Sequence, residues 1–62
     1  MTDTQVKKLA RGYGQTLHDA EDAQDNRAIT KSSDEWDAFY DALPPKQQKI
    51  AGMAHRETHY AK

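Results

Sequence analysis

The sequence contains no cysteine and has only two prolines and three glycines among its 62 residues. Without cysteine the chain has no disulfide framework and no thiolate for catalysis or metal binding, and nothing indicates an oxidising compartment. No apolar run reaches the length of a signal peptide's hydrophobic segment or of a membrane-spanning helix. We therefore expect a cytoplasmic protein that makes no use of a membrane.

Large apolar side chains are also scarce, with one tryptophan, one phenylalanine and a hydrophobic fraction of 35%. A domain of this size buries only about 60% of its unfolded surface, and its core rarely supplies more than about 3–5 kcal/mol. We therefore expect a single domain over residues 1–62. Its stability must come from helix packing, from a homodimer or from a bound partner.

The clearest pattern in the sequence lies in segment 32–45. Ser32 and Glu35 have the spacing of a capping box, and two consecutive prolines at the end of the segment stop a helix. Four large side chains between these signals share one helical face: Trp36, Phe39, Tyr40 and Leu43. The pattern predicts a helix over about 33–43 at the centre of the core, preceded by a connector over 25–31.

The N-terminal segment predicts a helix over about 3–24. Thr2 and Gln5 form a second capping-box pattern. Apolar residues then keep one helical register: Val6, Leu9, Ala10, Tyr13, Leu17 and Ala20. Gly12 and Gly14 each cost about 1 kcal/mol relative to alanine inside a helix, so the alternative is a helix that is bent or broken there.

A third helix is predicted over about 45–59, because Pro45 suits the first turn of a helix. The chain is thus expected to form an all-α, compact three-helix domain with short loops. The expected core draws on all three helices: Val6, Leu9, Tyr13, Leu17, Trp36, Phe39, Leu43, Ile50 and Met53.

The charges lie in alternating blocks, although the net charge is only −1. Residues 17–26 and 32–45 each carry a net charge of −4, and the segments around them are basic. Acidic blocks of this kind steer association toward basic partners, and aromatic side chains favour protein interfaces.

From these features we predict a small, non-enzymatic protein–protein interaction module with a regulatory or inhibitory role. It would use an acidic and aromatic helical face. The predicted partner-binding residues are Asp22, Asp25, Asp34, Asp37, Tyr40 and Asp41.

The alternative is a small DNA-binding regulator that uses the basic sides of the first and third helices. Cations neutralise phosphates, and the number neutralised sets the strength of binding. The residues that would serve this function are Lys7, Lys8, Arg11, Lys49, Arg56 and Tyr60.

His55 and His59 are the residues that come nearest to a metal-site pattern, because side chains four apart lie on one helical face. The intervening order, His-Arg-Glu-Thr-His, differs from the His-Glu-x-x-His of zinc proteases in the position of the glutamate. No third ligand is indicated and no catalytic constellation emerges. We therefore expect no metal, no cofactor and no enzymatic activity.

Overall fold

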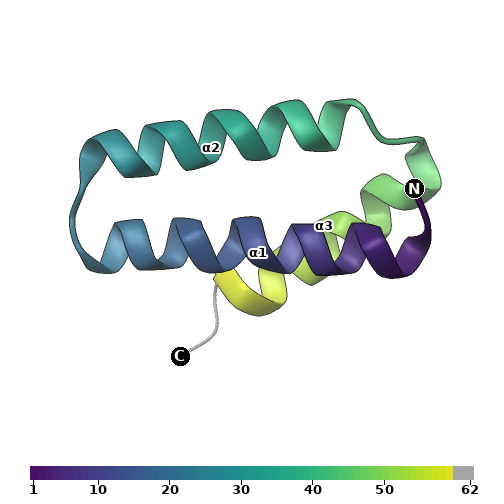
Figure 1. Ribbon diagram of the computed structural model, residues 1–62, viewed down its shortest axis with the longest axis horizontal. Coiled ribbons are helices and arrows are strands. Elements are labelled where there is room, and N and C mark those ends of the chain that lie inside the picture. The colour runs from purple at the N-terminus through teal and green to yellow at the C-terminus, as the bar shows by residue number, and fades with distance from the viewer. Residues whose placement is uncertain (60–62) are drawn as a thin grey trace.

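The computed structural model describes residues 1–59, which form three helices and no strand. They are α1 (Asp3–Asp22), α2 (Asn26–Asp41) and α3 (Pro45–His59) (Figure 1). The α1 and α2 helices lie side by side in opposite directions, and α3 crosses α1 (Figure 1). The predicted compact three-helix, all-α domain is thereby confirmed.

The first helix begins as its sequence predicts and then continues without a break. The Thr2 hydroxyl accepts a hydrogen bond from the Gln5 backbone N–H, and the Gln5 side chain accepts one from the Thr2 backbone N–H. Helical structure passes through Gly12 and Gly14, so the alternative of a broken helix is wrong.

The helix ends at Asp22, two residues earlier than predicted, because Gln24 adopts a left-handed backbone conformation with a φ of 55°. The backbone N–H of Asp25 bonds to the carbonyl of Ala20, and that of Gln24 to the carbonyl of Glu21. These two bonds form a Schellman motif, which closes the helix end.

The second helix begins at Asn26, so the predicted connector over 25–31 and the predicted cap at Ser32 are both wrong. The cap is Asp25, whose carboxylate accepts a hydrogen bond from the Ala28 backbone N–H. Ser32 lies inside the helix and is buried. Ile29, half-buried one turn before it, extends the inner side of α2 toward the loop.

The central element of the fold is α1 rather than the predicted aromatic helix. It packs against both other helices, most extensively against α3, whereas α2 and α3 contact each other much less. The buried core cluster is formed by Val6, Ala10, Leu43, Ala51 and Ala54. Trp36, Phe39, Tyr40 and Ile50 are partly buried against it.

Two residues of the predicted core are exposed. Leu9 is 44% exposed and Met53 is 69% exposed. On α3, Ala51 and Ala54 face the interior, and this rotation of the helix turns Met53 outward. Small side chains occupy the α1–α3 contact, and Met53 lies in the groove beside it, whereas Leu9 lies in the groove between α1 and α2.

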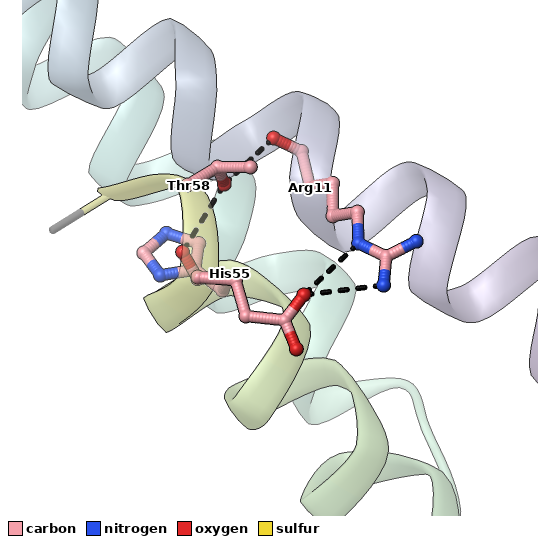
Figure 2. Close-up of polar contacts among 4 residues, drawn as sticks. Arg11, His55 and Thr58 are labelled. Carbon is pink, nitrogen blue, oxygen red and sulfur yellow. Dashed lines mark hydrogen bonds and ion pairs between the residues drawn. The ribbon is translucent and has the colours of Figure 1, made fainter. Parts of the chain in front are cut away.

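The α1–α3 contact leaves no room for a side chain at Gly14, which is buried. A Cβ atom at this position would lie 2.6 Å from the carbonyl oxygen of His55 and would also collide with the hydroxyl of Thr58. That hydroxyl lies 2.9 Å from the Arg11 carbonyl oxygen and 3.2 Å from that of His55. Both hydrogen bonds are drawn as dashed lines in Figure 2. Gly14 therefore allows the two backbones to approach.

Candidate functional site

The outer side of α2 carries three exposed aspartates, Asp34, Asp37 and Asp41. Their spacing of three and four residues places them on one helical face, opposite the side that packs on α1. Ala38 is also exposed and lies between Asp34 and Asp41 on this face. We call these four residues the acidic face. Within residues 1–59, none of its carboxylates forms an ion pair.

The other predicted partner-binding residues lie elsewhere. Asp22 ends α1, and Asp25 caps α2 with its carboxylate. Nine residues of helix at 1.5 Å each separate Asp25 from Asp34, so these two aspartates stand about 13 Å apart along the axis. Tyr40 is half-buried, and its ring packs against Trp36 at a centroid distance of 5.6 Å. The structure thus brings three of the six predicted residues together.

The predicted basic residues divide between different sides of the molecule. Lys7 and Arg11 line a groove of about 260 Å³ between α1 and α3. Arg11 forms an ion pair of 3.1 Å with Glu57, drawn in Figure 2. Lys8 lines a second groove, of about 340 Å³, between α1 and α2.

The remaining members of that set belong to the C-terminal region. Lys49 and Arg56 lie on the exposed side of α3. Tyr60 lies outside the described residues. No single surface of the described chain therefore presents the whole predicted nucleic-acid set.

Trp36 lies at the centre of an aromatic cluster between the three helices. Its ring contacts those of Tyr13 and Phe39 at centroid distances of 6.1 and 5.9 Å. The ring of His55, on α3, stacks on the Trp36 ring with a distance of 4.0 Å between the two centroids. Tyr13 belongs to α1 and His55 to α3, so the Trp36 ring joins α2 to both other helices, which makes Trp36 a structural residue.

The two histidines of α3 are held by different neighbours. The ring of His59 contacts that of His55 edge-on at 5.3 Å, and its Nε2 atom pairs with the carboxylate of Glu21. The His59 carbonyl oxygen lies 3.2 Å from Nδ1 of His18. Within residues 1–59, no three histidine, aspartate or glutamate side chains are arranged to hold a metal ion. The histidines therefore act here as packing and pairing groups.

His55 is the one buried titratable side chain in the described part of the chain. It is 8% exposed, and its Nε2 atom has no hydrogen-bond partner within residues 1–59. Burial lowers the pKa of His55 below its ordinary value of 6.5, and the neighbouring His59 lowers it further. The neutral ring is thus the form that fits between Trp36 and α1.

A loss of stability on acidification is expected from this lowered pKa. The unfolded chain takes up a proton at His55 near pH 6.5, before the folded chain does. The free energy of unfolding should therefore fall as the pH drops below about 6.5 toward the folded-state pKa. Urea unfolding of the wild type and of His55→Phe between about pH 7.5 and 5.5 measures this. The variant keeps a ring against Trp36 but cannot titrate, so an equal pH dependence in both proteins would contradict the assignment.

Comparison with protein-family models, with curated proteins and with solved structures finds no match to this chain. Among the described residues, no helix combines the length and the apolar character needed to cross a membrane.

Proposed function

We propose that the protein is a non-enzymatic binding module of the cytoplasm, and that its acidic face docks on a basic surface of a protein partner. The observation that supports this is the row of Asp34, Asp37 and Asp41, exposed on one side of α2 without an ion pair in residues 1–59. Like charges at this spacing repel one another and weaken a helix. A cationic partner would relieve that repulsion.

The binding would regulate the partner by covering its basic surface. Ala38, at the centre of the acidic face, lets a partner approach the backbone of α2 closely. The carboxylates around it would set the orientation and the rate of association, since exposed charges act more on steering than on affinity. If the partner binds nucleic acid, the aspartates would occupy the places of phosphates and inhibit that binding.

Site-directed crosslinking in an extract of the source cells tests the proposal. A photoreactive residue at Ala38 should capture a protein with a basic surface, whereas the same residue at Gln15, exposed on α1, should not. Binding of the purified captured protein should weaken at least tenfold in Asp34→Asn/Asp37→Asn/Asp41→Asn and weaken with rising salt. A control that neutralises two carboxylates of α1, Asp19→Asn/Asp22→Asn, should bind normally. Equal binding by the triple variant and the wild type would refute the proposal.

DNA binding remains the alternative. Four exposed cations without an ion pair in residues 1–59 favour it: Lys7, Lys8, Lys49 and Arg56. A salt titration against duplex DNA would detect it, because counterion release makes such binding fall steeply with salt. Binding at low salt that is lost in Lys49→Gln/Arg56→Gln would favour the DNA-binding function over the acidic face.

A further inference from the structure

The outer side of α3 carries a basic pattern that matches the acidic face in spacing. Lys49, Met53 and Arg56 are exposed and separated by four and then three residues. Asp34, Ala38 and Asp41 on α2 have the same separations. Each row spans seven residues, or about 10.5 Å along its helix axis. We call the three α3 residues the basic face.

The charged side chains of both rows are free of ion pairs within the described chain. Neither Lys49 nor Arg56 forms an ion pair in residues 1–59, and no carboxylate of the acidic face does. Met53, at 69% the most exposed large apolar residue of the described helices, stands between two cations. Ala38 stands between two carboxylates. When the two rows meet, the long side chain of Met53 therefore has room to pack over the small side chain of Ala38.

The two faces cannot meet within one molecule. Both α2 and α3 pack their inner sides against α1, and they contact each other little. Their outer faces consequently point away from the centre of the molecule in different directions, as the arrangement in Figure 1 illustrates. Only a second copy can bring an acidic face to a basic face.

We propose that the basic face of one copy docks on the acidic face of a second copy, with the two helices antiparallel. Arg56 would pair with Asp34 and Lys49 with Asp41. Met53 would lie about one residue, or about 1.5 Å, from Ala38 along the axis, because reversing one row exchanges its separations of three and four residues. The antiparallel direction aligns the helix dipoles favourably. It also keeps Lys46, which precedes the basic face, away from Lys31, which precedes the acidic face.

The contact is heterologous, because each copy uses two different surfaces. A copy that engages one neighbour through α2 still offers its α3 to another, so association continues to chains or closes into rings. A single helix–helix contact is smaller than a stable interface, which predicts a dissociation constant on the order of 0.1–1 mM at low salt. The inference concerns the same acidic face as the proposed function but does not depend on it. At high concentration a second copy would compete with the partner.

Sedimentation at about 0.05–2 mM protein tests the inference. In low salt, the average mass of the wild type should rise with concentration beyond that of a dimer, and about 0.5 M NaCl should reduce it toward the monomer. Asp34→Asn/Asp41→Asn and Lys49→Gln/Arg56→Gln should each remain monomeric alone. Their equimolar mixture retains one matching pair of faces, so it should form dimers and stop there. Circular dichroism should show that both variants keep the helical content of the wild type.

Control variants with the same change of charge elsewhere, Lys7→Gln/Lys8→Gln and Asp19→Asn/Asp22→Asn, should associate like the wild type. A wild type that stays monomeric at 2 mM in low salt would overturn the inference, as would a mixture that stays monomeric or grows beyond dimers. Self-association that is unchanged in Lys49→Gln/Arg56→Gln would also overturn the inference, because the copies would then associate without the basic face. The proposed function is judged separately, because Lys49→Gln/Arg56→Gln should still bind the crosslinked basic partner.

Discussion

Gly14→Ala is expected to destabilise the protein by about 2 kcal/mol, even though alanine is the better helix former. The added Cβ would meet the carbonyl oxygen of His55 at 2.6 Å and the Thr58 side chain. Thr58 can rotate away, but the His55 carbonyl belongs to the backbone of α3, so α3 must move as a whole. For a domain of this length, the melting temperature should fall by about 8–16 °C. Thermal unfolding followed by circular dichroism measures the change.

The other two glycines provide matched controls for this substitution. A Cβ at Gly12 or Gly52 would meet nothing within 4 Å, and both lie inside helices. Gly12→Ala and Gly52→Ala should therefore each stabilise the protein by up to about 1 kcal/mol. A Gly14→Ala protein as stable as these two would show that α1 and α3 do not approach as closely as described.

Trp36→Ala is the second substitution with a large expected effect. Removal of a core tryptophan costs about 3–5 kcal/mol, and the half-buried position of Trp36 places its cost near the lower limit. The rings of Tyr13, Phe39, Tyr40 and His55 would all lose contact. Because a core of this size supplies about 3–5 kcal/mol, most of the stability of the domain would be lost. Urea unfolding and far-ultraviolet circular dichroism at 25 °C measure this.

Trp36→Phe is the control for the loss of an aromatic ring. It keeps a ring against His55 and should cost less than half as much as Trp36→Ala. A Trp36→Ala protein that stays fully folded, but no longer binds the crosslinked partner, would make Trp36 an interface anchor. The aromatic cluster would then belong to the binding surface and not to the core.

The parts of the fold that could be predicted from sequence are those with strong local signals. The Thr2–Gln5 capping box and Pro45 fixed the beginnings of α1 and α3, because caps and first-turn prolines act within a few residues. The start of α2 was missed. The predicted connector begins at Asp25, which is in fact the N-cap, and the sequence from 26 to 31 has only one large apolar residue to reveal a helix.

The packing of the helices could not be predicted from the pattern of large side chains. That pattern predicts the aromatic helix at the centre of the core. The structure instead buries small residues between α1 and α3: Ala10, Gly14, Ala51 and Ala54. The four-residue spacing of Ala10 and Gly14 is the signal that could have revealed it. Small side chains contribute little apolar surface, so their role becomes visible only when two backbones are placed together.

The part of the candidate site that the sequence could place is the grouping of three aspartates on one helical face. Asp34, Asp37 and Asp41 share a face because a helix fixes their spacing, and the structure keeps that face exposed. Asp25 lies away from that face, and its carboxylate caps α2. The matching row on α3 was missed because Met53 had been assigned to the core. Which side of α3 faces α1 depends on tertiary contacts.

The smaller contact of α2 with the other two helices has a consequence for motion. Since α2 has few contacts with α3, it can detach while the tight α1–α3 pair stays intact. Such an opening costs less free energy than unfolding of the whole chain, so backbone amide hydrogens of α2 would exchange with solvent deuterium sooner than those around Gly14. The helix that carries the exposed carboxylates would then be the element best able to adjust its position on a bound surface.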